Sequence, residues 1–211
     1  MLFRSANDET TQFISDTLVN NQMLGLAVNG TGVALEYDPK NAFTFRVGAQ
    51  QSNPDATSLS DSIYSLAEVG YTMTPFGLPE GHYRGWFRAN NGEVQSKRAA
   101  GISLDQRLTP KVMLFGRYGA QDLGDGLFSD CSSAFARCSD QYFSGGLSFA
   151  NGLNFNPYDT WGVGYAQMDL SSGEKEKLTE WFYNLQMTEK LHLSRSEEHT
   201  SELQSRFGIS Y

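Results

Sequence analysis

The residues that could do chemistry in this sequence are charged and aromatic side chains that alternate along short segments. Arg84, Trp86 and Arg88 stand at every second position of one segment. Guanidinium and indole groups on one face can hydrogen-bond and stack against a polar solute. The other candidates for the same polar lining are Glu68, Asp105, Arg107, Arg117 and Arg46. A second interpretation stays open, in which opposite charges only pair across neighbouring strands.

Histidine and cysteine indicate no catalytic or metal centre. His82, His192 and His199 share no ligand spacing, so neither a metal nor a cofactor is expected. A hydrolase that uses a serine with His82 is the enzyme hypothesis, and no motif supports it. Cys131 and Cys138 would form a disulfide in an oxidising compartment and stay as two thiols in the cytosol.

Composition narrows the class of protein. The 211 residues are 39% hydrophobic, 13% aromatic and 19% charged, with a net charge of -8. No apolar run approaches the roughly 20 residues of a membrane-spanning helix. The net negative charge, without any basic cluster, argues against nucleic acid as a partner. The generous aromatic content also argues against a disordered acidic chain.

Apolar and polar side chains alternate with period two from Val33 onward. Phe43, Phe45 and Val47, for example, alternate with Thr44 and Arg46. Segments of about 8 to 10 residues with two different faces are typical of antiparallel strands. We therefore expect an all-β fold over residues 33–194.

The connections between these segments alternate as well. Short turns such as 38–41 and 109–111 alternate with long polar loops at 51–62, 90–98, 120–140 and 171–179. Short turns on one side and long loops on the other are typical of an outer-membrane β-barrel. A soluble antiparallel β-sandwich that binds sugar is the alternative. Charges along whole strands of the polar face favour the barrel.

The two ends of the chain differ from this pattern. Residues 1–32 predict a short helix and a Gly-rich loop, either folded into the barrel or lying on its surface. Residues 195–205 read RSEEHTSELQS, which matches the in-frame translation of a widely used sequencing adapter. We therefore treat residues 195–206 as foreign to the protein and 195–211 as an unreliable tail.

Several stretches resemble the carbohydrate-selective porins of the OprB type. They are Ala6 to Phe13, Leu18 to Asn21, Gly30 to Gly32, Tyr37 to Pro39, Glu68 to Tyr71, Gly145 to Leu147, Trp161 to Tyr165 and Glu180 to Leu193. The resemblance covers nearly all of residues 3–194, and the Asn-Asp-Glu-Thr-Thr-Gln block is its most distinctive part.

The resemblance implies a bacterial outer-membrane barrel of about 16 strands that conducts monosaccharides and similar small solutes passively. Small carbohydrates and outer-membrane lipid would then be its partners. The sequence holds about nine complete strands and the start of a tenth, so we expect an internal fragment of the parent porin. Sugar hydroxyls and ring faces would meet the charged and aromatic residues of the polar lining.

Overall fold

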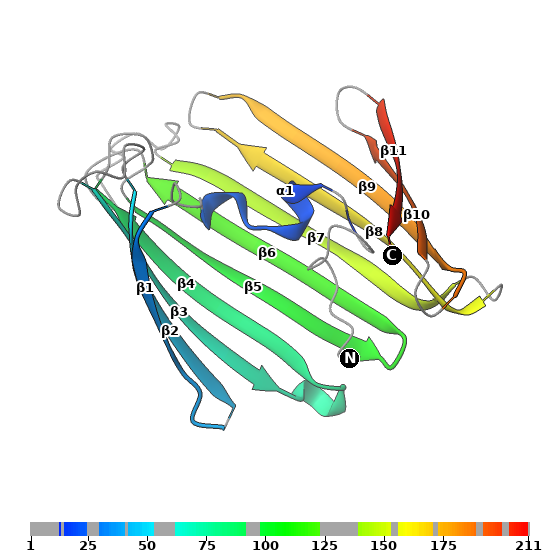
Figure 1. Ribbon diagram of the computed structural model, residues 1–211, viewed down its shortest axis with the longest axis horizontal. Helices are drawn as coiled ribbons and strands as arrows, with labels where there is room; N and C mark the ends of the chain where they lie inside the picture. The colour runs from blue at the N-terminus through cyan, green and yellow to red at the C-terminus, as the bar shows by residue number, and fades with distance from the viewer. Residues whose placement is uncertain are drawn as a thin grey trace.

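The computed structural model forms one antiparallel sheet whose strands follow one another in chain order (Figure 1). It describes residues 13, 15–24, 30–40, 42–52, 62–91, 98–122, 139–152, 156–170, 173–188, 192–199 and 203–210. The eleven strands are β1 (Gly32–Tyr37), β2 (Phe43–Gln51), β3 (Ile63–Met73), β4 (Gly81–Asn90), β5 (Arg98–Thr109), β6 (Val112–Asp122), β7 (Ser139–Gly152), β8 (Asn156–Asp169), β9 (Lys175–Gln186), β10 (His192–His199) and β11 (Leu203–Ser210). The predicted all-β antiparallel fold is thus confirmed.

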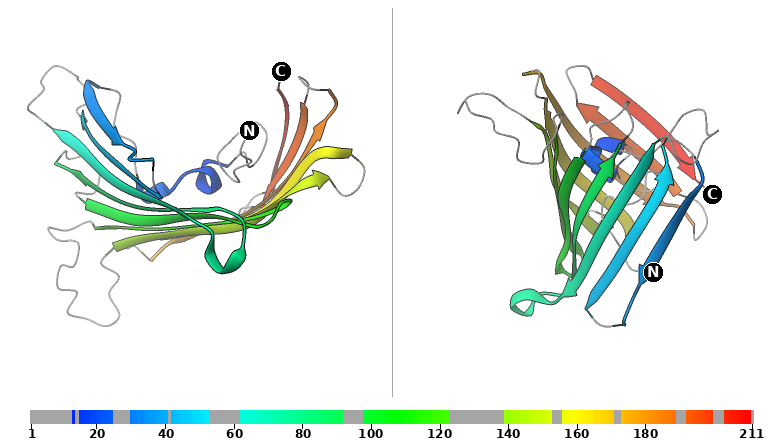
Figure 2. Two further views of the ribbon diagram at one scale, coloured as in Figure 1. Left: turned by 90° about the horizontal axis from the view of Figure 1, so that it is seen from below. Right: turned by 90° about the vertical axis from the view of Figure 1, so that its left-hand side faces the viewer.

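The sheet curves into an open trough, with β1 and β11 at its two edges (Figure 2). A short helix, α1 (Asp16–Val19), and a 3-10 turn, η1 (Gln22–Leu24), lie inside the concave side. A second 3-10 turn, η2 (Pro75–Gly77), connects β3 to β4. All described strands belong to this one sheet, so the two packed layers of a sandwich are not what the described residues form.

The two faces of the sheet have opposite chemistry. Val47, on the convex face, is 52% exposed, whereas Arg88, on the concave face, is 1% exposed. A water-soluble protein normally buries the apolar residue and exposes the charged one. The convex face carries further large apolar side chains that are exposed, namely Val33, Leu35, Tyr37, Phe43, Phe45, Val69, Phe87, Ile102, Tyr118, Phe143, Val163 and Trp181.

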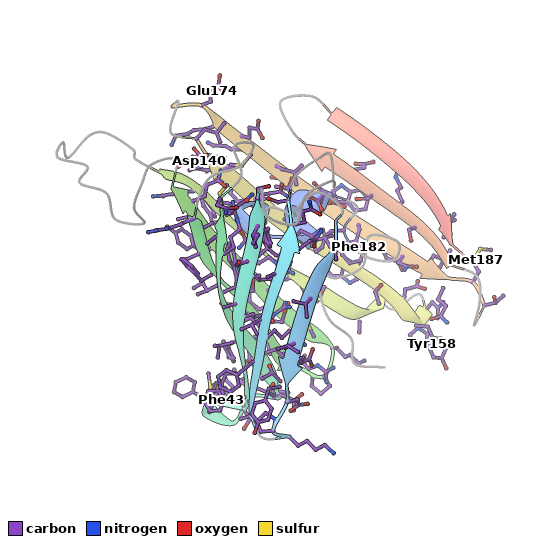
Figure 3. All side chains as sticks on the ribbon, turned by 60° about the vertical axis from the view of Figure 1, so that its left-hand side comes forward. Phe43, Asp140, Tyr158, Glu174, Phe182 and Met187 are labelled. Carbon is purple, nitrogen blue, oxygen red and sulfur yellow. The ribbon has the colours of Figure 1, made fainter. Side chains whose placement is uncertain are left out.

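The strand ends that short turns join lie at one end of the trough, and the strand ends that the longer connections join lie at the other. Figure 3 shows Phe43, Tyr158 and Met187 toward the first end, and Asp140 and Glu174 toward the second. We call these the turn end and the loop end. The predicted alternation of short and long connections therefore corresponds to two ends of one sheet.

Some strands are longer than the sequence pattern predicts. Strands β7 and β8 each have 14 residues, and β9 already begins at Lys175 inside the loop expected over 171–179. Lys175 and Lys177 stand at the outward positions of β9, in register with Asp169 and Gln167. Because these side chains are charged, apolar and polar residues no longer alternate in this part of the sequence. The backbone pairing of β8 and β9 nevertheless continues beyond the apolar part of the convex face.

The inner face of the middle strands holds an apolar cluster with α1 and η1. Phe13 is fully buried and packs edge-on against Phe115 and Phe182, with ring centroids 5.3 and 4.8 Å apart. Leu18 and Met23 join the same cluster. Among the described residues no helix is long and apolar enough to span a bilayer.

Strands β10 and β11 include the letters that match the sequencing adapter. Residues 192–199 pair with β9 in antiparallel register, and the Ser196 hydroxyl also donates to Glu180 and to the carbonyl of Trp181 on β9. The free edge of a sheet accepts backbone pairing from many sequences. We expect independent amplification of the gene past codon 194 to yield different residues at 195–206. Recovery of the same codons from a second library, prepared with a different adapter, would contradict this prediction.

Candidate functional site

The concave face divides into an open part and a covered part. Residues 15–24, here called the inner segment, cross the middle strands at the loop end of the trough (Figure 1). The remaining concave surface of β1 to β5, toward the turn end, carries paired charges. The eight candidate residues fall into both parts, with different surroundings in each.

The open part begins with a row of charges across three strands. Glu36, Arg46 and Glu68 are register partners on β1, β2 and β3. The guanidinium of Arg46 lies 2.8 Å from each carboxylate. These contacts fit the interpretation in which charges pair along the wall. The Arg46 side chain is still 47% exposed, so a solute on the concave side could reach it.

Beside this row lies a polar pocket of about 180 Å³. Arg84 and Asp105 form an ion pair across it, at 3.5 Å. The polar side chains around this pocket include those of Thr44, Arg46, Thr72, His82, Arg84 and Asp105. The pocket combines cationic donors, an anionic acceptor and neutral hydroxyls within a small volume, which suits a small polyhydroxylated solute.

His82 stands at the edge of this pocket. Its Nδ1 atom lies 3.0 Å from the Thr72 hydroxyl, and its Nε2 atom lies 3.4 Å from Glu80. The partners that the structure gives His82 are therefore a threonine and a glutamate, where the hydrolase hypothesis required a serine. The described residues also contain no cluster of three potential metal ligands.

Trp86, Arg88 and Arg117 lie in the covered part. Their exposed fractions are 6%, 1% and 6%. Arg88 Nε donates to the carbonyl of Met23 at 2.9 Å, and Arg117 donates to the carbonyl of Leu18 at 2.9 Å. Arg88 and Arg117 thus contact the inner segment, and all three side chains are buried. Contact of these residues with solute stays a prediction.

Arg107 is half-buried near the turn end of β5. It lies at a register shift between Arg107 and Thr109, and its carbonyl accepts a hydrogen bond from Gln106 at 2.7 Å. Cys131 and Cys138 lie outside the described residues, so their pairing stays a prediction.

Sequence reasoning missed the tyrosines that face inward beneath the inner segment. Tyr142 is fully buried, and its hydroxyl donates to the carbonyl of Asn20 at 3.1 Å. Tyr64 donates to the carbonyl of Leu24 at 2.9 Å. A signal was present, because both tyrosines occupy positions of the polar face, where a phenol needs a hydrogen-bond partner.

The open antiparallel sheet has the fold of part of a β-barrel known from solved porin structures. The solved structures of OprB from Pseudomonas putida at low and at high pH match 84% and 85% of the chain, with TM-scores of 0.62 and 0.64. Their sequence identities are 18% and 15%, so the likeness concerns the fold. No protein-family model matches the sequence.

A curated relative of undescribed function matches a smaller part of the chain. It is an uncharacterized protein from Aquifex aeolicus (strain VF5), 28% identical over 120 residues. The match covers 57% of this chain and 35% of the relative. The chain also spans only 52% and 56% of the two OprB structures, which is about half of each.

Proposed function

We propose that this chain is part of an outer-membrane porin that passively conducts monosaccharides and similar small solutes. The observation that carries the proposal is the distribution of side chains on one curved sheet. Large apolar residues are exposed on the convex face, and charged residues are paired or buried on the concave face. This arrangement suits a wall with lipid outside and water inside.

Strand length and aromatic placement support the membrane setting. Strand β2 has 9 residues and β3 has 11, which is the length of a tilted strand that crosses a bilayer. Toward the turn end, outward-facing rings pack in pairs: Phe43 lies 4.6 Å from Tyr71, and Phe149 lies 4.1 Å from Trp161 between centroids. Aromatic girdles of this kind mark the bilayer interface in outer-membrane barrels.

A complete barrel is part of the same proposal. The sheet has one edge at β1, and β10 and β11 fall largely in the tail that we treat as foreign or unreliable, so β9 is the other edge of the wall that belongs to the protein. Unpaired backbone groups are too costly to leave in contact with lipid. Further strands of the whole protein would pair with β1 and β9 and close the wall. The share of the OprB structures that the chain covers, about half, agrees with this arrangement.

Passage would depend on diffusion through a polar lumen. A sugar entering from either end would exchange water for hydrogen bonds with the pocket around Arg84 and Asp105. The Arg84–Asp105 pair is neutral, whereas the Glu36–Arg46–Glu68 row has two carboxylates for one guanidinium and is negative. Anions would therefore be disfavoured relative to neutral polyhydroxylated solutes.

We expect the complete barrel to make liposomes permeable to glucose faster than to gluconate, a charged solute of similar size. Arg84→Met should lower the rate for glucose by about threefold, because it removes hydrogen-bond donors from the pocket. Lys111→Met is the matched control, since Lys111 is exposed in the turn between β5 and β6. If wild-type protein lets glucose and gluconate pass equally fast, the barrel is a pore without preference for neutral solutes, which contradicts the proposed selectivity. If neither solute passes, the proposed channel function is refuted.

A further inference from the structure

We propose that Lys175 and Lys177 form a binding surface on the outside of the wall for a glycolipid whose sugar headgroup carries phosphate. The surface comprises the outward side chains of Gln167, Asp169, Lys175 and Lys177 at the loop end of β8 and β9, here called the loop-end belt. The inference rests on the membrane setting of the proposed function and names one lipid that the wall binds. The belt lies on the convex face, outside the lumen.

The strands that carry the belt are longer than a bilayer crossing requires. Strands β7, β8 and β9 have 14, 14 and 12 residues, whereas β2 and β3 have 9 and 11. About 9–11 residues suffice for a tilted strand to cross the hydrocarbon core. Part of the longer strands must therefore stand among the lipid headgroups, and the outward side chains show which part.

The outward side chains of β8 and β9 change from apolar to charged toward the loop end. Val163 is exposed in the apolar part, and the next outward residue of β8, Tyr165, contacts Phe143 with ring centroids 5.9 Å apart. Aromatic residues of this kind mark a bilayer interface. Lys177 and Lys175 stand one and two outward positions beyond these rings. With a rise of about 3.3 Å per residue and a tilt of about 45°, they lie roughly 5 and 10 Å above the rings, in the headgroup region.

The loop-end belt has a net positive charge, although the whole chain has a net charge of -8. Lys175 and Lys177 are both exposed, and Asp169 is the one carboxylate among the four side chains of the belt. Glu176, between the two lysines, stands at an inward position of β9. Phosphate is the anionic group that lipids present at this depth, so the charge of the belt is complementary to a phosphorylated headgroup.

Hydrogen bonds order the polar side chains beside the lysines. The Tyr165 hydroxyl donates to Gln167 Oε1 at 2.9 Å, and Gln167 Nε2 donates to Asp169 Oδ1 at 2.7 Å. Lys175 Nζ lies 3.7 Å from the same oxygen and its side chain is 47% exposed, so this long ion pair is weak and Lys175 can turn to a phosphate.

The same side chains favour a sugar headgroup over that of a plain phospholipid. The amide of Gln167 and the carboxylate of Asp169 lie beside the two lysines and can exchange hydrogen bonds with sugar hydroxyls. Long connections lie on the extracellular side of outer-membrane barrels, so the lipid belongs to the outer leaflet. Phosphate, sugar and depth together indicate a phosphorylated glycolipid.

The test measures lipid bound to the complete barrel in detergent by native mass spectrometry, with lipid A as the probe. Lipid A carries two phosphates on its sugars. Lys175→Gln together with Lys177→Gln should weaken its binding by about 20-fold, because each lysine near an anionic lipid contributes about fivefold. Arginine at both positions keeps the charges and should bind lipid A as tightly as wild type.

Two exposed lysines at the turn end supply the matched control. Lys40→Gln together with Lys111→Gln removes the same number of charges from the two turns that follow β1 and β5, so it should leave the affinity for lipid A unchanged. An equal loss of affinity in this control would show that only the net charge of the barrel matters, and would overturn the inference.

Asp169→Asn separates lipid binding from charge pairing within the wall. The change makes the belt more positive, so lipid A should bind about threefold more tightly. If Lys175 served only to pair with Asp169, the affinity for lipid A would stay as in wild type, which would contradict the proposed surface.

Comparison ligands identify the chemistry that the belt recognises. Lipid A without its phosphates should bind at least tenfold more weakly than lipid A, and phosphatidylglycerol or inorganic phosphate should compete poorly with it. Equal binding of phosphatidylglycerol would show a general anionic-lipid surface and overturn the glycolipid assignment. Unchanged binding of lipid A in the double glutamine variant would overturn the site itself. Glucose permeation through phosphatidylcholine liposomes without lipid A tests the channel separately, and its absence would refute the proposed function instead.

Discussion

Arginine in place of Val47 is expected to destabilise the complete barrel by about 2–4 kcal/mol, the cost of this residue on a lipid-facing strand near the bilayer midplane. Val47 lies at the centre of β2 on the convex face and is 52% exposed. The measurement is the free energy of unfolding, obtained by denaturant titration of protein refolded into phospholipid vesicles.

The adjacent residue supplies the control for this prediction. A Cβ atom on Gly48 would meet only ordinary contacts of 3.5 Å or more on the concave face. Gly48→Arg would place its charge near Arg46, which already has two carboxylate partners, so a small effect is expected. On a water-exposed convex face, Val47→Arg would change stability by no more than about 0.5 kcal/mol. That result would contradict the membrane setting.

The outward face was predictable from the sequence because it follows a local rule. Phe43, Phe45 and Val47 alternate with Thr44 and Arg46, and in the structure the first three are exposed on the convex side. Period two is a property of the extended backbone, so neighbours in sequence are enough to assign the faces. The same rule does not predict which other residues pack against each face of the sheet.

Arg46 and Arg88 show where that local rule ends. Both alternate with apolar residues in the same way, yet the Arg46 side chain is 47% exposed and Arg88 is 1% exposed. The difference comes from Met23, 65 positions away from Arg88 in the chain. Arg117 is likewise covered by Leu18, 99 positions away. Contacts over such distances in sequence leave no periodic signal.

The inner segment itself was only partly predictable. The sequence suggested a short helix near Phe13 to Leu18 with a polar residue as its cap, and α1 covers Asp16–Val19. No side-chain cap bond forms at Ser15, whose N–H instead donates to Glu180 on β9 at 3.0 Å. A helix of one turn is unstable alone, so its conformation depends on docking against the wall.

Phe13→Ala is expected to cost about 3–5 kcal/mol of docking free energy, the usual range for a fully buried phenylalanine. Phe13 precedes the inner segment by two residues and anchors it by packing against Phe115 and Phe182. The loss should release the segment while the barrel remains folded. Val19→Cys, a buried position of α1, reports this release through its rate of reaction with a thiol reagent.

The labelling rate should rise by about 100-fold or more, because each 1.4 kcal/mol changes an equilibrium tenfold. Both variants are made in the background without Cys131 and Cys138, so that only the reporter reacts. Phe87→Ala is the matched control, since Phe87 is 41% exposed on the convex face and lies away from the apolar cluster. Its labelling rate should equal that of the reporter alone. An equally slow rate in Phe13→Ala would show that the hydrogen bonds from the wall suffice to hold the segment without its aromatic anchor.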